Sequence, residues 1–179
     1  KYDPSNPASH SIVQTPEAEL VQAERQWGNA YDAGFKGRFI VFHGSNPQTP
    51  RLLKDLHRRL KPDFRSYVEM TPHHALLNTE DSAKHGAHVK INPPIRPPQI
   101  QEELFEEILT GNVHMIGSDH APHTAARKTG PKPASGTPCI LAIPLLAHLL
   151  RERGISETRL EALLFHNANN IYFGGRLVP

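Results

Sequence analysis

Residues 116–123 read Ile-Gly-Ser-Asp-His-Ala-Pro-His and carry the most specific chemical pattern in the chain. An apolar, β-favouring run ends there, and Asp119 follows it, with histidines one and four positions later. An aspartate at the end of a strand can bind a divalent metal or transfer a proton, and histidines can bind a metal or an anionic substrate. The less specific interpretation is a polar turn with incidental histidines. The residue types favour a catalytic or metal site around Asp119.

Two further strands are predicted to end in polar residues. Arg38–His43 is a short apolar strand bounded by glycines, and His43 ends it. Arg65–Met70 is a second strand, which Thr-Pro-His-His follows. Val113–Ser118 is the third and leads into Asp119. Because parallel strands deliver their carboxyl ends to one rim, these side chains are expected to lie near each other.

Helices are expected before, between and after the strands. The spacing of Leu20, Ala23, Trp27 and Ala30 predicts one buried helical face. The expected helices are Pro16–Ala33, Leu52–Leu60, Gln101–Leu109, Ile140–Arg153 and Glu157–Phe165, and residues 1–16, 71–100 and 124–138 are expected to be loops.

This alternation predicts an α/β fold with parallel, buried strands. Three strands cannot close a (β/α)₈ barrel, which needs about 250 residues. We therefore expect a partial TIM-like barrel, formed by 1–179 as a single domain with no internal repeat.

Composition excludes several classes of function. The 20 basic and 18 acidic residues leave a net charge of +2, so nothing calls for nucleic acid or a membrane surface. One cysteine, Cys139, excludes an internal disulfide and suits a reducing compartment. No apolar run is long enough to span a bilayer, and the N-terminus does not look like a signal peptide, so a soluble, cytoplasmic protein is expected.

Five segments together resemble the C-terminal half of the dihydroorotase barrel, in the cyclic amidohydrolase group of the amidohydrolase superfamily. They are Phe-His-Gly-Ser (42–45), Val-Glu-Met-Thr-Pro-His-His-Ala-Leu-Leu (68–77), Lys-Ile-Asn-Pro-Pro-Ile-Arg (90–96), Ser-Asp-His-Ala-Pro-His (118–123) and Ser-Gly-Thr-Pro (135–138). Their order matches the family. The chain departs from it at Cys139, where the family usually continues Pro-Gly-x-Glu-Thr.

The resemblance implies a zinc-dependent hydrolase that interconverts dihydroorotate and N-carbamoyl-aspartate in pyrimidine biosynthesis. His43 and Asp119 would be metal ligands, and Asp119 would also be the general base. Asn92 and His123 would hold the substrate ring and carboxylate, and Gly136 would contact the ring through its backbone. A metal that polarises the amide carbonyl and a carboxylate that moves the proton suit this chemistry.

The resemblance also implies that part of the site is supplied from elsewhere. The family's metal ligands on the first, fourth and fifth strands, and its C-terminal β-domain, have no counterpart in these residues. A catalytic zinc normally has three protein ligands. We therefore expect negligible activity from the chain alone, and a missing N-terminal polypeptide, a homo-oligomer or an aspartate transcarbamoylase are the partners considered.

Other interpretations stay open. The chain could be a non-catalytic dihydroorotase-like scaffold beside an aspartate transcarbamoylase, or a hydrolase of another cyclic amide. His43 could bond a backbone carbonyl, and Asn92 could belong to a rigid turn before prolines. His73 and His74 are expected to shape the rim rather than bind metal. His85 and His88 are expected at the surface, and Cys139 in the interior.

Overall fold

A computed structural model describes Asp3 and residues 7–178. It contains a parallel three-stranded sheet in the order β1-β2-β3, formed by Arg38–Val41, Arg65–Met70 and Met115–Ile116. Val41 pairs with Val68, and Met70 pairs with Ile116. The α/β alternation and the parallel strands agree with the sequence prediction. The predicted third strand is shortened to its middle, although His114 and Gly117 still donate backbone hydrogen bonds to β2.

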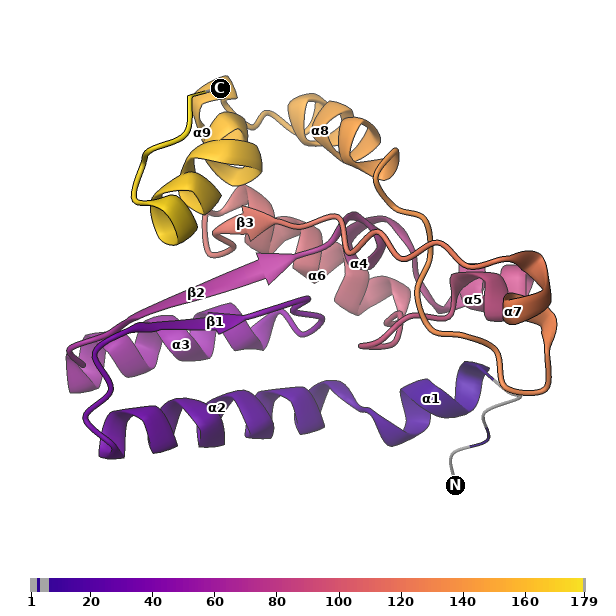
Figure 1. The fold of residues 1–179 in the computed structure, drawn as a ribbon, viewed down its shortest axis with the longest axis horizontal. Helices are drawn as coiled ribbons and strands as arrows, with labels where there is room; N and C mark the ends of the chain where they lie inside the picture. The colour runs from indigo at the N-terminus through magenta and orange to yellow at the C-terminus, as the bar shows by residue number, and fades with distance from the viewer. Residues whose placement is uncertain (1–2, 4–6, 179) are drawn as a thin grey trace.

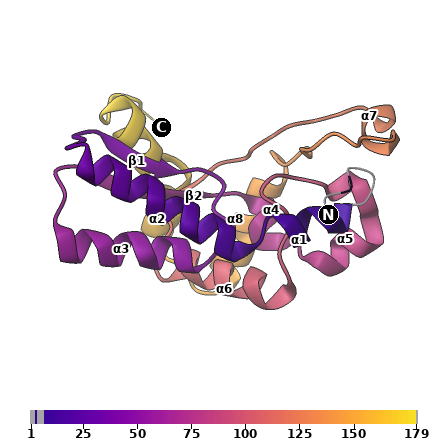
Figure 2. The same cartoon turned by 90° about the horizontal axis from the view of Figure 1, so that it is seen from below.

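Helices α2 (Pro16–Asp32) and α3 (Gln48–Leu60) lie along the same side of β1 and β2, as both views show (Figures 1 and 2). Helix α2 begins with Pro16 in its first turn, and the Thr15 side chain caps it by accepting from the Ala18 N–H. Trp27 is the centre of the cluster between these helices and the sheet: it is 1% exposed, stacks on Tyr31 and donates to Ser66 Oγ.

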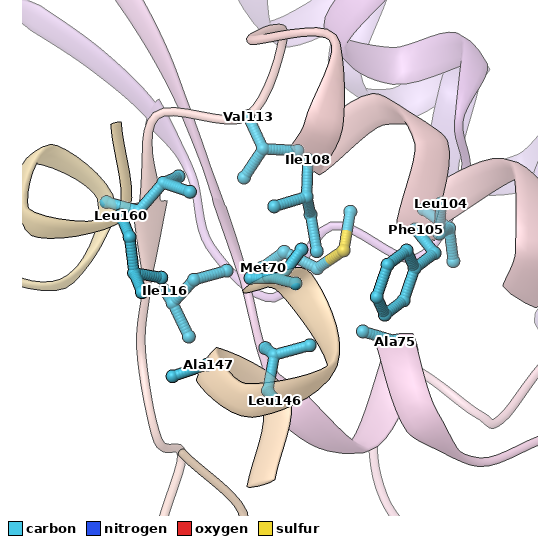
Figure 3. Packing of buried hydrophobic residues seen from close by; sticks show 12 residues of the cluster. Met70, Ala75, Leu104, Phe105, Ile108, Val113, Ile116, Leu146, Ala147 and Leu160 are labelled. Carbon is cyan, nitrogen blue, oxygen red and sulfur yellow. The ribbon is translucent and has the colours of Figure 1, made fainter. Parts of the chain in front are cut away.

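The larger core lies between β2, β3 and helices α4 (Pro72–Leu76), α6 (Pro98–Leu109), α8 (Ala142–Glu152) and α9 (Glu157–Glu161). Met70 occupies its middle, with Ile108 of α6 on one side and Leu146 of α8 on another (Figure 3). Two π-helical stretches, η2 (Ala162–His166) and η3 (Asn169–Phe173), follow α9.

Replacing Ile108 with valine tests how tightly this core is packed. Ile108 is fully buried, so the lost methylene leaves a small cavity, and unfolding should become easier by about 1 kcal/mol. Urea denaturation followed by the fluorescence of Trp27 measures the change. An exposed site, Ile12→Val, is the control, and an equal effect of the two substitutions would show that the core is loosely packed.

The three expected loops each contain helix. Helix α1 (Pro7–Val13) lies within 1–16, of which residues 1–2 and 4–6 fall outside the described part of the chain. Helices α4 and α5 (Thr79–His85) and a 3-10 turn, η1 (Gly86–Val89), lie within 71–100. Helix α7 (Ala125–Thr129) lies in 124–138. These elements are short, so they carry too few residues for a periodic apolar pattern.

The segment that carries α7 runs away from the helical layers before the chain returns to α8 (Figures 1 and 2). A bridge between His120 and Thr137 closes its base. None of the helices in the described ranges combines the length and the hydrophobicity of a membrane span.

Candidate active site

The structure brings His43 and Asp119 together beyond the carboxyl ends of β1 and β3. Nε2 of His43 lies 3.8 Å from Oδ1 of Asp119. Both residues have left-handed backbone, with φ of 54° and 43°. Residues other than glycine rarely adopt this conformation, and it clusters at functional sites where the surrounding fold enforces it. The parallel strands therefore place these two side chains side by side, as the spacing in the sequence predicted.

Glu69 lies behind His43. Its Oε1 is 3.1 Å from Nδ1 of His43, a close ionic contact whose N–H direction falls short of a well-aligned hydrogen bond. The Glu69 carboxylate raises the pKa of His43 through this contact, against burial, which lowers it. A Cβ on Gly117 would come within 2.5 Å of the Glu69 carboxyl carbon, so glycine at this position makes room for the carboxylate.

The carboxylate of Glu69 fixes which nitrogen of His43 faces the site. With Nδ1 turned to Glu69, Nε2 is directed toward Asp119. Histidines that bind metals commonly have a carboxylate on the other ring nitrogen. Sequence reasoning placed Glu69 among the polar residues at the end of the second strand, but it did not pair Glu69 with His43 and offered a backbone carbonyl as the alternative partner of His43. The available signal was a charged residue between the apolar Val68 and Met70, at the carboxyl end of the strand.

His73 is a second residue that sequence reasoning undervalued. Its side chain is 1% exposed, its Nε2 lies 3.9 Å from Oδ2 of Asp119, and neither ring nitrogen has a hydrogen-bond partner among the described residues. Burial, helped by the charge of His43, lowers its pKa to about 4. A neutral, unpartnered imidazole therefore faces Asp119 from β2's end of the rim.

His74 has the structural role that the sequence suggested for both histidines. Its Nδ1 is 2.7 Å from Oγ1 of Thr71, and its Nε2 is 3.0 Å from the carbonyl oxygen of Pro93. This contact ties the start of α4 to the segment that carries Asn92. The side chain of Asn92 is exposed, and a cis peptide bond joins it to Pro93.

His123 and Gly136 lie next to each other across the base of the α7 segment. Nε2 of His123 is 2.8 Å from the carbonyl oxygen of Ser135. Gly136 has φ of 113°, and a Cβ there would meet the Ala121 side chain at 2.6 Å and Nε2 of His123 at 3.2 Å. Only glycine fits this backbone and this approach.

His85, His88 and Cys139 lie where the sequence predicted them. His85 and His88 are exposed, and Cys139 is buried. Nδ1 of His120 accepts the backbone N–H groups of Cys139 and Ile140, at 3.1 and 3.2 Å. His120 therefore anchors the chain that follows Thr137, a role that the sequence did not reveal.

The donor atoms around Asp119 suit zinc in kind but not in number. Imidazole nitrogen and carboxylate oxygen are ordinary zinc ligands, and in a tetrahedral site such atoms lie roughly 3.4 Å apart. The His43–Asp119 separation of 3.8 Å is close to that spacing. In the part of the chain that the structure describes, however, no three His, Cys, Asp or Glu side chains are arranged to hold a metal ion. His43 and Asp119 would therefore need further ligands.

Buried His73 should make the fold sensitive to acid. Its pKa falls from the ordinary 6.5 to about 4, so between these values the unfolded chain binds a proton that the folded chain does not. Stability should therefore fall as pH falls from about 6.5 to 4, by up to roughly 1.4 kcal/mol per pH unit. His74, also buried, acts in the same sense, whereas His43, with its raised pKa, acts in the opposite one.

The comparison of His73→Gln with wild type isolates this contribution. Urea midpoints measured from pH 4 to 7 should depend less steeply on pH in the variant, and exposed His85→Gln should leave the dependence unchanged. Equal slopes in wild type and His73→Gln would show that His73 takes up its proton as readily in the folded state.

Curated relatives of this chain are dihydroorotases. The chain is 41% identical over 120 residues to the dihydroorotase of Halalkalibacterium halodurans, a match that covers 66% of this chain and 27% of that protein. It is 29% identical over 165 residues to the dihydroorotase of Halobacterium salinarum, covering 90% and 37%. The chain thus spans only about a quarter to two fifths of these relatives. No family model matches it.

Solved structures show the same fold. The D-hydantoinase (dihydropyrimidinase) of Thermus sp. superposes with a TM-score of 0.82 at 21% identity, covering 94% of this chain and 38% of the other. The dihydroorotase of Saccharomyces cerevisiae, in complex with 5-fluoroorotic acid, gives 0.71 at 21% identity, covering 87% and 43%. In sequence the chain is therefore related to the dihydroorotases, and in fold it corresponds to about two fifths of the hydantoinase and dihydroorotase structures.

Proposed function

We propose that this chain supplies part of the catalytic rim of a zinc-dependent dihydroorotase. The observation that carries the proposal is the pairing of His43 Nε2 with Asp119 at 3.8 Å, with Glu69 on the other nitrogen of the imidazole. The relationship to dihydroorotases of two organisms supports the choice of substrate. The other metal ligands would come from barrel strands outside this sequence, in the same or another polypeptide.

The proposed reaction needs metal binding, proton transfer and orientation of a metal ligand, and different residues supply them. A zinc ion held by His43, Asp119 and the additional ligands would polarise the scissile carbonyl and acidify the attacking water. Asp119 takes the proton of that water and passes it to the leaving amide nitrogen, so that one group serves as base and then as acid. Glu69, on Nδ1 of His43, leaves Nε2 of the same ring directed at the position of the ion.

Substrate is recognised by the segment that carries α7 and by the turn at Asn92-Pro93. The carboxylate of dihydroorotate is held by His123, the ring by Asn92, and the backbone at Gly136 closes against the ring. The proximity of His123 and Gly136, and the exposure of His123 and Asn92, support this assignment. His73 lines the site as an uncharged imidazole beside Asp119.

A hybrid barrel tests the proposal. In the dihydroorotase of H. salinarum, the segment that aligns with this chain is replaced by the aligned residues, which make up 90% of this chain, so that a complete set of strands is restored. We expect the hybrid barrel to bind zinc and to hydrolyse dihydroorotate, whereas the 179-residue chain alone should show negligible turnover. Metal content and dihydroorotate hydrolysis are measured on the same preparations.

The alternative is a non-catalytic scaffold beside an aspartate transcarbamoylase, and the incomplete ligand set in the described ranges is what favours it. The hybrid barrel separates the two proposals. A hybrid barrel that folds and binds zinc but turns over no dihydroorotate would reject the enzyme and leave the scaffold. Binding of the isolated chain to an aspartate transcarbamoylase would then be the expected result.

A further inference from the structure

We propose that Lys128 is a positioning residue for substrate binding, because it ties together the three segments that carry Asn92, His123 and Gly136. The inference rests on the proposed function for its substrate. We call the two lysines that make the connection, Lys90 and Lys128, the lysine latch.

Lys128 is an ammonium group buried among carbonyl oxygens. It lies on α7, is 4% exposed, and directs its Nζ into the loop rather than toward solvent. Nζ donates to the carbonyl oxygens of Gly136 at 2.7 Å, Ala134 at 3.1 Å and Lys90 at 3.2 Å. An ammonium has three protons, so the three carbonyls satisfy it completely.

Lys90 completes the latch from the other side. It is 8% exposed, and its Nζ donates to the carbonyl oxygen of Pro133 at 2.8 Å. Its backbone carbonyl also accepts the N–H of Gly136 at 2.9 Å. Both lysines therefore bind backbone of residues 133–136, and they do so from two separate segments. Burial, with the charge of Lys90, lowers the pKa of Lys128, as expected for a cation removed from water.

Each predicted substrate contact is adjacent to a residue that the latch holds, either along the chain or through a hydrogen bond. Lys90 stands two positions before Asn92. The carbonyl of Ser135, between the latched Ala134 and Gly136, is the partner of His123 Nε2 at 2.8 Å. A loop without this anchor would leave Asn92 and His123 freer to move relative to each other, because Nζ of Lys128 joins the carbonyl of Lys90 to those of Ala134 and Gly136. Ordering a loop before the ligand arrives lowers the entropic cost of binding.

Replacing Lys128 with a neutral side chain of similar length distinguishes the effect of its hydrogen bonds from the effect of its packing. Lys128→Met keeps the volume but removes the ammonium that donates to three carbonyls, of which only that of Lys90 still accepts a backbone N–H, from Gly136. Lys132→Met, at an exposed position of the same loop, is the matched control. Lys128→Arg keeps the charge and should recover part of the effect.

The first measurement concerns the latch and needs no catalysis. In the 179-residue chain, the amide protons of Ala134 and Gly136 should exchange with solvent at least about tenfold faster in Lys128→Met than in wild type or Lys132→Met. The amides of Ile108 and Val68, in the cores, should be unchanged. If Ala134 and Gly136 exchange at the wild-type rate, there is no latch.

The second measurement concerns substrate. In the hybrid barrel, Lys128→Met should raise the KM for dihydroorotate and the Kd for orotate by about tenfold or more, with kcat and zinc content changing much less. Equal losses in kcat and in zinc content would assign Lys128 to general stability and overturn the positioning role. A hybrid barrel that is inactive with lysine, arginine or methionine at position 128 would instead reject the proposed function. The amide exchange rates in the 179-residue chain would still decide whether the latch exists.

Discussion

Replacing Asp119 with asparagine should reduce dihydroorotate hydrolysis by the hybrid barrel by about a thousandfold, because the amide cannot accept the proton of the attacking water. Asparagine is the appropriate replacement for a backbone at φ 43°, since it tolerates the left-handed region better than most residues. The steady-state rate at saturating dihydroorotate is the measurement. The loss should fall mainly on kcat.

Two further observations make this result specific. Asp63→Asn, at an exposed position, is the control for removing one carboxylate, and it should retain wild-type activity. Zinc content of Asp119→Asn should fall as well, because one ligand is weakened. Should Asp119→Asn keep a tenth or more of the activity, Asp119 is neither base nor essential ligand, and the assignment of the reaction to this rim is wrong.

Replacing Arg96 with methionine should cost about 3–5 kcal/mol of folding stability, the usual penalty for leaving a buried charge without its partner. Arg96 is 2% exposed and lies 3.7 Å from Oε2 of Glu19. Its Nε and Nη2 also donate to Oγ of Ser45, at 3.1 and 2.9 Å. Its removal leaves the Glu19 carboxylate, whose side chain is only 14% exposed, without a cation.

The same network holds the turn that follows His43. Glu19 accepts the backbone N–H groups of Ser45 and Asn46, each at 3.1 Å, and the hydroxyl of Thr49 at 3.0 Å. Loss of Arg96 should therefore loosen the turn as well as destabilise the fold. Urea denaturation monitored by Trp27, the single tryptophan, measures the stability.

The control for Arg96 is an exposed ion pair. Arg151 pairs with Glu157 at 2.6 Å on the surface, and Arg151→Met should change the urea midpoint little. Glu19→Gln combined with Arg96→Met should restore part of the lost stability, because no unpaired charge then remains and the amide oxygen can still accept from the turn. A loss of less than 1 kcal/mol in Arg96→Met alone would show that water reaches this network in the folded state.

The positions of the three strands could be predicted because each contains apolar, β-favouring residues and lies near glycines or prolines, although β3 is shorter than predicted. It predicted the meeting of His43 and Asp119 because parallel strands end on the same rim, whatever lies between them. The pairing of His43 with Glu69 could not be predicted in the same way. It depends on the register between β1 and β2, in which Val41 pairs with Val68, and on the space that Gly117 leaves for the carboxylate.

The lysine latch was outside the reach of the sequence for a different reason. Lys128 is typical of a solvated loop, and nothing in its neighbours distinguishes it from exposed Lys132. Its burial depends on carbonyl groups from segments 38 residues apart, and carbonyls carry no signature in the side-chain sequence. Helix α5 was missed although Asn78 and Asp81 form a reciprocal capping box, which a search for caps alone would have found.

The left-handed backbone at His43 and Asp119 restricts how the site could diversify under laboratory evolution. Saturating either position with the full amino-acid alphabet would offer few residues that fit both φ and chemistry, with Asn, Asp, His and Gly the least strained. Valine, isoleucine and threonine are excluded at both positions by their branched Cβ. A variant that prefers a different metal would therefore have to carry its substitutions at neighbouring residues, and not at His43 or Asp119.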